Sequence, residues 1–338
     1  MRTKGELKSG SPFQFITNAV NFVFSFMNTI LTESVEEAAE FIARGKIVAF
    51  PTETVYGLGA NAFDQTAIAE IFQAKQRPPD NPLIAHVHEI AQIALLARRV
   101  TPVAERLIER FFPAPLTLIL PKSEKVPAIA SAGLDTIGVR MPQHDLALQF
   151  LKACRAPLVA PSANLSGRPS PTTWQAVFED LNNRIDCILR GDNARIGLES
   201  TVVDCTSETP LVLRAGAIAL EELRQVSAEI RIAAPDSPEA RRSPGVRHKH
   251  YAPRAKVVLV DLLGDLMNAT NAAFIGLNEP PQQFELQKIC VDAEEYARQL
   301  FAFFRLCDSQ KIKTIYCQTV AETKIGSALM DRLRRAAE

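Results

Sequence analysis

The sequence has no surplus of charge of either sign, because 38 Lys and Arg residues are balanced by 38 Asp and Glu residues. Aromatic residues are also few, at 7% of the chain. Proteins whose main task is to bind nucleic acid usually present a basic surface with stacking aromatics. Both shortages argue against a dedicated RNA-binding module, so any contact with RNA must come from a local basic patch.

Cysteine pairs with the spacing of metal ligands are missing as well. The six cysteines lie at positions 154, 187, 205, 290, 307 and 317, with no C-x-x-C pair among them. This scatter excludes a zinc ribbon and a redox pair, and free thiols fit a reducing, cytoplasmic compartment. The pairs His86/His88 and His248/His250 have a spacing that suits metals, but no carboxylate or cysteine set completes a ligand sphere. We therefore expect no metal held by the protein alone.

The phosphate-binding pattern G-x-x-x-x-G-K-[ST] does not occur, which excludes that class of nucleotide site. The run from Gly57 to Ala62, GLGANA, formally matches a dinucleotide fingerprint. A true fingerprint leads directly from a strand into its helix, whereas the segment from Thr52 to Tyr56 separates this run from the strand before it. We expect tight-turn glycines beside a site instead.

No apolar run is long and clean enough for a membrane span. Residues 13–31 come nearest, but three asparagines interrupt them and no small-x-small cleavage site follows. Their apolar positions lie three and four apart, which predicts an amphipathic helical stripe of Phe13, Ile16, Val20, Val23, Met27 and Ile30. Several interpretations remain open for this segment: an atypical extension or an over-early start codon, a docking helix, and a targeting signal.

What the chain does contain is a long alternation of strand and helix patterns. Its 338 residues predict two domains. Helices are expected to begin after Ser34, Asp64 and Thr101, and to cover 145–154, 172–181 and 221–226. Strands are expected at 46–50, 116–120, 136–141, 158–160, 185–189, 200–204 and 211–214. This order predicts an α/β domain on a mixed sheet.

The texture changes at residues 234–254, where prolines and a basic surplus predict an extended linker. Strands at 256–261, 273–277 and 313–318, with helices at 293–306 and 321–337, predict a second small α/β domain. The expected divisions are an atypical extension (1–31), a catalytic domain (32–233), a basic linker (234–254) and a C-terminal domain (255–338).

Polar side chains crowd the segment that follows the strand at 46–50. Thr52, Glu53, Thr54 and Tyr56 supply hydroxyls, a carboxylate and a phenol. Because α/β sheets commonly bind ligands where strands end, this run predicts part of a binding site. An ordinary hydroxyl-rich turn would have the same composition.

Two cations close together predict a site for phosphate. Lys75 and Arg77 end a helix and enter a loop in which three prolines surround Asn81. A planar guanidinium and a compact ammonium suit a polyphosphate. Cations at a helix end also complement its dipole, but a solvated helix end needs no such rigid loop.

Further polar residues end predicted strands. Ser162 and Asn164 lie on one side of an extended segment and can both donate to a bound oxygen, although a Ser/Asn turn is the plainer reading. No G-x-S-x-G accompanies them, which argues against a serine hydrolase. Arg140 and Arg214 end apolar strands, where a carboxylate or phosphate could be bound. His86 lies on a strand, and a lone strand histidine is more often structural than catalytic.

Taken together, these segments resemble the YrdC-like family, the threonylcarbamoyl-adenylate synthases, over residues 32–254. The matching pieces are FPTETVYGLGA (50–60), the K-x-R of Lys75 and Arg77 with RPPDNPL after it, the S-x-N of Ser162 and Asn164, LESTVVD (198–204), LRAG (213–216) and SPGVRHKHYAP (243–253). The last motif and the extra domain resemble the longer, two-domain branch.

The resemblance implies a twisted mixed sheet around a concave, electropositive cleft, with a Rossmann-like C-terminal domain. It also implies that ATP, L-threonine and bicarbonate are turned into L-threonylcarbamoyl-AMP and pyrophosphate, with Mg2+ carried by the ATP. The product would pass to a downstream threonylcarbamoyl-transferase complex that modifies the adenosine beside a tRNA anticodon, and tRNA would meet this chain directly or indirectly. A cytoplasmic enzyme with no membrane contact is expected.

The resemblance also implies roles for single residues. The threonine-side group is Thr54, His86, Arg140, Ser162 and Ser200. The nucleotide-side group is Lys75, Arg77, Asn81, Thr136, Asn164, Thr172, Arg214 and Tyr251. Lys75 and Arg77 are expected to carry catalysis by positioning and neutralising phosphate, since no strong base or nucleophile is required. The linker with Tyr251 is expected to act as a lid.

One rival interpretation is a carbamoyl transferase for hydrogenase maturation that uses a related domain. Such proteins usually carry acylphosphatase-like and zinc-finger parts, for which this chain has neither the length nor the cysteine spacing. The noncatalytic RNA-binding module is the other rival.

Overall fold

The computed structural model describes residues 28–234, 237, 239–244, 251–261 and 269–338. Most of the predicted N-terminal stripe, the pair His248/His250 and the centre of the basic linker lie outside the described residues. Among the described residues, no helix has the length and apolar character needed to cross a bilayer.

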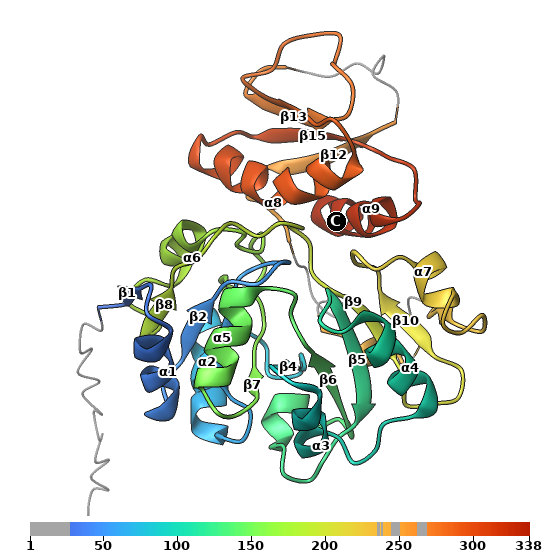
Figure 1. The fold of residues 1–338 in the computed structure, drawn as a ribbon. Helices are drawn as coiled ribbons and strands as arrows, with labels where there is room; N and C mark the ends of the chain where they lie inside the picture. The colour runs from blue at the N-terminus through green and yellow to red at the C-terminus, as the bar shows by residue number, and fades with distance from the viewer. Residues whose placement is uncertain (1–27, 235–236, 238, 245–250, 262–268) are drawn as a thin grey trace, which may run out of the picture.

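A large mixed sheet and a small parallel sheet organise the chain (Figure 1). The larger sheet has the strand order β1-β8-β2-β3-β7-β4-β6-β5-β9-β10-β11 and the smaller one β12-β15-β13-β14. The strands of the larger sheet are β1 (Ile30–Thr32), β2 (Val48–Phe50), β3 (Gly57–Asn61), β4 (Ile84–His86), β5 (Leu116–Pro121), β6 (Thr136–Arg140), β7 (Leu158–Val159), β8 (Cys187–Leu189), β9 (Thr201–Asp204), β10 (Leu211–Arg214) and β11 (Arg231–Ile232). Those of the smaller sheet are β12 (Lys256–Val260), β13 (Ala272–Gly276), β14 (Leu286–Ile289) and β15 (Thr314–Gln318).

The helices cover both faces of the larger sheet and lie against the smaller one. They are α1 (Val35–Ala43), α2 (Gln65–Lys75), α3 (Ile93–Leu96), α4 (Pro102–Phe111), α5 (Asp145–Ala153), α6 (Trp174–Leu181), α7 (Leu220–Arg224), α8 (Ala293–Ser309) and α9 (Ile325–Ala337). The predicted helix starts are confirmed, because the side chains of Ser34, Asp64 and Thr101 accept hydrogen bonds from the first turns of α1, α2 and α4.

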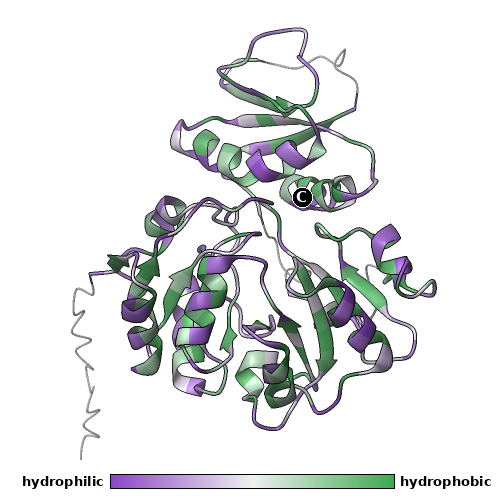
Figure 2. Ribbon diagram, in the orientation of Figure 1, coloured by the Kyte–Doolittle hydropathy of each residue, from purple (hydrophilic) through white to green (hydrophobic). Residues whose placement is uncertain are grey.

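Strand β2 is apolar at every position because both of its faces are buried. Val48 and Phe50 pack with α1 and α5 in one hydrophobic cluster, whereas Ile47 and Ala49 belong to another that includes α2. A strand covered on both faces needs apolar side chains on both. In Figure 2 the strands of this sheet are mostly green, while α1 and α5 alternate green and purple, as expected of helices that cover a sheet with one side.

Two expectations from the sequence are wrong. The glycines of GLGANA form strand β3 rather than a tight turn, and β3 pairs antiparallel with β2. A Cβ on Gly59 would lie 3.0 Å from the Phe50 ring, so glycine is needed here for close packing inside the sheet. Ile30, the last member of the predicted helical stripe, lies in β1, which gains its stability by pairing with β8.

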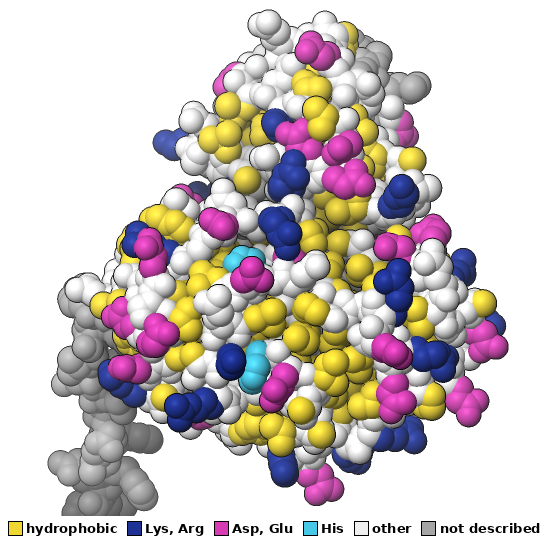
Figure 3. Space-filling view, in the orientation of Figure 1, with side chains coloured by type: hydrophobic (Ala, Val, Ile, Leu, Met, Phe, Trp, Pro, Cys, Tyr) yellow, Lys and Arg dark blue, Asp and Glu magenta, His cyan; other side chains and the backbone are white. Residues whose placement is uncertain are grey.

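The smaller sheet is parallel throughout, and α8 and α9 lie between it and the larger domain (Figure 1). Two arginines of these helices cross the contact. Arg305 of α8 lies 2.8 Å from a carboxylate oxygen of Asp180, and Arg332 of α9 lies 2.8 Å from one of Glu199. The outer face in Figure 3 shows acidic and basic side chains interspersed, as the neutral composition requires.

Gly197 provides a test of this domain contact. It has a φ of +84°, and an added Cβ would lie 2.5 Å from the Cα of Arg298 in α8. We expect Gly197→Ala to lower the free energy of unfolding by about 2–4 kcal/mol, because left-handed strain adds to a clash with backbone. Urea denaturation of the purified variant measures this.

Gly133 is the matched control, since its φ is +77° and a Cβ would meet nothing within 4 Å. Gly133→Ala should cost about 1 kcal/mol, from backbone strain alone. Equal losses in the two variants would mean that the contact with α8 tolerates a methyl group.

Candidate active site

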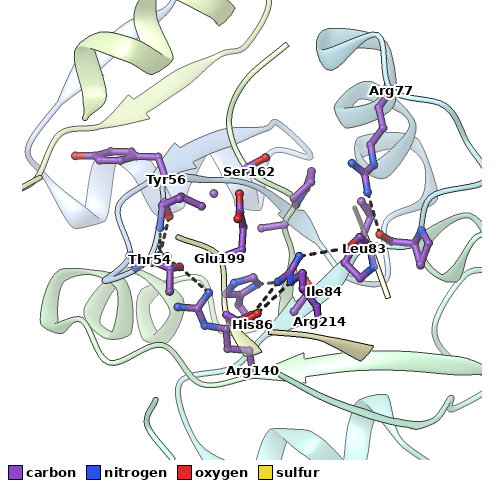
Figure 4. A pocket seen from close by; sticks show the side chains of 18 of the residues that line it. Thr54, Tyr56, Arg77, Leu83, Ile84, His86, Arg140, Ser162, Glu199 and Arg214 are labelled. Atoms are coloured by element: carbon purple, nitrogen blue, oxygen red, sulfur yellow. Dashed lines mark hydrogen bonds between the residues drawn. The ribbon is translucent and has the colours of Figure 1, made fainter. Parts of the chain in front are cut away.

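A pocket opens beside one end of the strands β4, β6, β5 and β9. All five residues of the expected threonine-side group line it, together with Arg77, Arg214 and Tyr251 of the expected nucleotide-side group. Figure 4 shows His86, Arg140 and Arg214 gathered at one side of this pocket, with Ser162 and Tyr56 across from them. The polar segment between β2 and β3 forms another wall, as its composition predicted.

The sheet register brings two of these residues together. His86 is the ladder partner of Arg140 across the parallel pair β4–β6, and Arg140 is the partner of Thr117 across β6–β5. Ladder partners project from the same face of a sheet, so the three side chains form a row. His86 and Arg140 end their strands and Thr117 is the second residue of β5, so the row lies at one end of these strands.

Arg140 is a buried cation that is already oriented. It donates a hydrogen bond to Thr54 Oγ1 (2.9 Å), and its NH2 lies 2.7 Å from Glu53 Oε2. Glu53 is fully buried, so its carboxylate is placed as an internal counter-ion rather than as a surface partner. The Nε of Arg140 has no acceptor within the described part of the chain. A buried N–H without an acceptor favours an incoming anion.

His86 is held as a neutral imidazole. Burial, followed by the neighbouring charge of Arg140, lowers its pKa to about 3. Its Nδ1 lies 3.1 Å from the carbonyl oxygen of Ile84, and a carbonyl can only accept, so the ring proton belongs on Nδ1. Nε2 is then a hydrogen-bond acceptor at the pocket wall.

Ser200 and Arg214 contact each other directly, although they were expected on different substrates. Arg214 donates to the carbonyl oxygen of Ser200 and to its Oγ, both at 3.1 Å, and to the carbonyl oxygen of Pro244 in the linker (3.3 Å). Ser200 Oγ also lies 2.8 Å from Thr117 Oγ1. The two predicted groups therefore meet at this point.

Arg77 lies on the wall opposite this row of strand ends. Helix α2 ends at Lys75. The residue that follows, Gln76, has a left-handed conformation, which turns the chain into the proline-rich loop. There Arg77 donates to the carbonyl oxygens of Asn81 (3.3 Å) and Pro82 (3.1 Å), while its Nε has no acceptor among the described residues. Burial lowers its pKa to about 10, so the guanidinium remains a cation at neutral pH.

Lys75 lies behind the pocket wall rather than on its surface. Its Nζ donates to the carbonyl oxygens of Ser162 and Asn164, both at 2.5 Å. Burial, and then the charge of Arg77, lowers the pKa of Lys75 well below its usual value. Asn164 likewise turns its amide toward the carbonyls of Leu165 and Arg168, and its Oδ1 accepts from Ser162 Oγ (2.5 Å). Both residues thus brace the segment that presents Ser162.

Five residues of the nucleotide-side group do not line the pocket, namely Lys75 and Asn164, described above, and three others. Asn81 is buried in the loop after Arg77, and Thr172 is buried just before α6. Thr136 begins β6, at the opposite end of that strand from Arg140, and lines a separate surface hollow with Arg98 and Arg242.

Sequence reasoning missed Glu199, which lines the pocket beside Ser200 and is buried. Its place inside LESTVVD, one of the pieces that match the family, was the available signal. It also missed Arg332, whose partner Glu199 lies in the other domain, 133 residues away in sequence.

Comparisons with known proteins agree with this geometry. A family model described as "Telomere recombination" matches residues 40–216, and one described as "Threonylcarbamoyl-AMP synthase, C-terminal domain" matches residues 218–338. The Pyrococcus abyssi threonylcarbamoyl-AMP synthase is 44% identical over 88% of this chain and 92% of its own length. The chain belongs to the threonylcarbamoyl-AMP synthase family.

A second relative and a solved structure also match most of the chain. The Bacillus subtilis threonylcarbamoyl-AMP synthase is 37% identical over 90% of this chain and 92% of its own length. The crystal structure of the Pyrococcus abyssi protein complexed with L-threonine superposes with a TM-score of 0.85 at 41% identity, covering 92% of this chain and 97% of that one. The family resemblance read from the motifs is confirmed.

The buried neutral His86 predicts a pH dependence of stability. Its folded pKa of about 3 lies below the ordinary value of 6.5, so the unfolded chain binds the proton more tightly. Stability is therefore lost as the pH falls from about 6.5 toward about 3, by up to about 1.4 kcal/mol per pH unit from this group. We expect His86→Asn to flatten the slope by that amount between about pH 6 and about pH 4, measured by urea denaturation. An unchanged slope would show that His86 is not neutral and buried in solution.

Proposed function

We propose that this chain makes L-threonylcarbamoyl-AMP from L-threonine, bicarbonate and ATP, with release of pyrophosphate. The observation that carries the proposal is one pocket, in which the five expected threonine-side residues, Arg140 among them, lie together with Arg77 and Arg214. Such a pocket suits a substrate pair with a carboxylate and a polyphosphate. The relatives described above support the proposal, because they are named threonylcarbamoyl-AMP synthases and one of them is a complex with L-threonine.

In this proposal Arg140 binds the carboxylate of threonine. Its Nε supplies a buried donor, and Thr54 and Glu53 hold the guanidinium in place. His86 accepts a hydrogen bond from the threonine at Nε2, and the hydroxyls of Ser162 and Ser200 line the remaining space. The amine of threonine is then free to react.

The reaction requires no covalent intermediate with the protein. Bicarbonate takes up a proton and loses water to give carbon dioxide. The amine of threonine adds to the carbon dioxide and releases a proton, and the resulting carbamate carries a negatively charged oxygen. That oxygen attacks the α-phosphorus of ATP, the bond to the bridging oxygen breaks, and pyrophosphate leaves. Negative charge builds on the phosphate oxygens, so fixed cations near them lower the barrier.

Arg77 and Arg214 are the cations that we assign to the phosphates. Both are buried and line the pocket, and Arg214 is tied to Ser200 and to the linker carbonyl of Pro244. Lys75 and Asn164 would support the nucleotide through the segment that carries Ser162. Asn81, Thr136 and Thr172 complete the proposed nucleotide side at the periphery, and Lys75 with Arg77 are proposed to carry catalysis.

We propose that Mg2+ enters with ATP and is held by phosphates and water. Within the described ranges, no group of three or more His, Cys, Asp and Glu side chains is arranged to hold a metal ion. When bound, such an ion would neutralise phosphate charge. The chain's own contribution is the arrangement of arginines.

The wider setting of the enzyme is proposed from the same family membership. The adenylate would pass to a threonylcarbamoyl-transferase complex acting on tRNA in the cytoplasm, with tRNA reaching this chain directly or indirectly. Domain limits of 32–233 and 255–338, joined by the linker, are supported by the two sheets, except that β1 (Ile30–Thr32) adds two residues of the predicted extension to the larger sheet. The parallel order β12-β15-β13-β14, with helices α8 and α9, supports a Rossmann-like class for the C-terminal domain.

The linker is proposed to close over the nucleotide through Tyr251. This residue lines the pocket, is buried, and stacks on Phe301 of α8 with ring centroids 5.6 Å apart. A ring in this position would exclude water from the site and protect the labile carbamate.

The proposed reaction predicts threonine-dependent release of pyrophosphate. Purified protein with ATP, magnesium and bicarbonate should release pyrophosphate with threonine and not without it. Lys75→Ala should reduce the rate at least about 100-fold, since one buried lysine braces both Ser162 and Asn164. A coupled pyrophosphate assay measures both.

Lys152→Ala is the matched control, because Lys152 is exposed at the end of α5. It should retain the full rate. No release with any amino acid, from folded protein, would contradict the synthase and favour the RNA-binding module. A requirement for carbamoyl phosphate would favour the carbamoyl transferase.

The lid predicts a separate effect on the intermediate. Tyr251→Ala should raise the ratio of free threonine and AMP to intact adenylate, because water reaches the carbamate. Tyr251→Phe keeps the ring and should behave like the wild type. Chromatography of the quenched reaction quantifies the products, and identical product ratios in Tyr251→Ala and wild type would rule out the lid.

A further inference from the structure

A completely buried arginine of the C-terminal domain faces the pocket of the other domain. Arg332, in the middle of α9, is 0% exposed. A guanidinium is removed from water only at a large cost unless its N–H groups find partners. Its partners therefore reveal what the domain contact is arranged to hold.

Most of those partners lie outside the C-terminal domain. Nε donates to Glu199 Oε2 at 2.8 Å, and NH2 donates to the carbonyl oxygen of Ala215 at 3.2 Å. The guanidinium also lies over the ring of Tyr251, 5.2 Å from its centre. Asp331, the preceding residue on α9, supplies the one partner from its own helix that the described chain gives it, at 2.5 Å.

These partners are the neighbours of the proposed catalytic groups. Glu199 precedes Ser200, Ala215 follows Arg214, and both Glu199 and Tyr251 line the pocket. The other oxygen of Glu199 accepts from Ser170 Oγ at 2.6 Å. Both carboxylate oxygens are thus engaged, and the carboxylate is fixed on the side of Arg332.

The charges explain why that matters. Burial alone would raise the pKa of Glu199, but the charges of Arg332 and then Arg214 lower it, so the group is a carboxylate at neutral pH. Without Arg332, a buried negative charge would remain beside Arg214. It would pair with Arg214 and repel an incoming phosphate.

We propose that Arg332 is a positioning residue of the active site supplied by the C-terminal domain. It neutralises and holds Glu199, which leaves the charge of Arg214 for the nucleotide, and it supports the ring of Tyr251 at the pocket. The inference rests on the proposed function, and it gives the C-terminal domain a direct part in nucleotide binding.

The test compares Arg332→Met with a variant that removes the opposing charge as well. Arg332→Met should weaken ATP binding at least about tenfold and raise the KM for ATP more than it lowers kcat, because a buried carboxylate is left uncompensated. Glu199→Gln in the Arg332→Met background should recover most of the lost affinity. A merely structural arginine would give no such rescue.

Two further variants separate charge from folding. Arg332→Lys keeps the positive charge but loses the planar set of donors, so its ATP affinity should lie between those of the wild type and Arg332→Met. Arg334→Met, on the same helix, removes an exposed arginine paired with Glu322 and should change nothing. Thermal unfolding of each variant is recorded, and if Arg332→Met does not fold, the charge-neutral double variant and Arg332→Lys still give the comparison with wild type.

The readouts are ATP affinity by isothermal titration, without threonine, and threonine-dependent pyrophosphate release. Wild-type affinity in folded Arg332→Met, no rescue by Glu199→Gln, or a failure of both Arg332→Lys and the double variant to bind ATP would overturn the proposal. A wild-type protein that binds ATP but releases no pyrophosphate would refute the proposed function, while the affinities would still decide the role of Arg332.

Discussion

Mutual repulsion among buried arginines is the constraint on which this structure depends. Arg77, Arg140, Arg214 and Arg332 are all at most 9% exposed and surround or adjoin one pocket. Like charges that lie close together in a weakly polar interior repel strongly. Two buried carboxylates offset part of this, Glu53 beside Arg140 and Glu199 beside Arg332.

The compensation is incomplete in a way that suits catalysis. Glu53 and Glu199 balance two of the four charges, so a net positive pocket remains for a carboxylate and a polyphosphate. A site with fully paired arginines would gain nothing from an anion, because each guanidinium would first have to leave its partner. A bound anionic substrate thus reduces the repulsion among the buried arginines, which is unfavourable in the folded protein without substrate.

The parts of the fold that sequence could predict are those set by local patterns. Ser34, Asp64 and Thr101 were identifiable as helix caps because a capping side chain acts within three residues of itself. The apolar run at β2 was readable as a buried strand for the same reason. The glycines of β3 were misread, because what they make room for is the ring of Phe50 on the neighbouring strand.

The same distinction between local patterns and long-range contacts applies to the residues of the site. Strand-end residues such as His86 and Arg140 could be named from their motifs, and the ladder then placed them side by side. Local pattern could not show that Lys75 braces the backbone of Ser162 and Asn164, 87 and 89 residues away. Glu199 and Arg332 were missed for a further reason, since a buried ion pair between domains leaves no periodic pattern in the sequence around either partner.

The contacts at Tyr251 also bear on how a closed pocket admits its substrates. In the closed arrangement the ring is 5% exposed, stacked on Phe301 and covered by Arg332. Aromatic stacking and cation–π contacts contribute about 0.5–2 kcal/mol each. Opening the proposed lid would therefore cost only a few kcal/mol, roughly the free energy that separates a minor conformer from a major one. In the proposal the same contacts re-form around bound nucleotide, so that the C-terminal domain favours closure without preventing entry, which a larger hydrophobic seal over the pocket could not do.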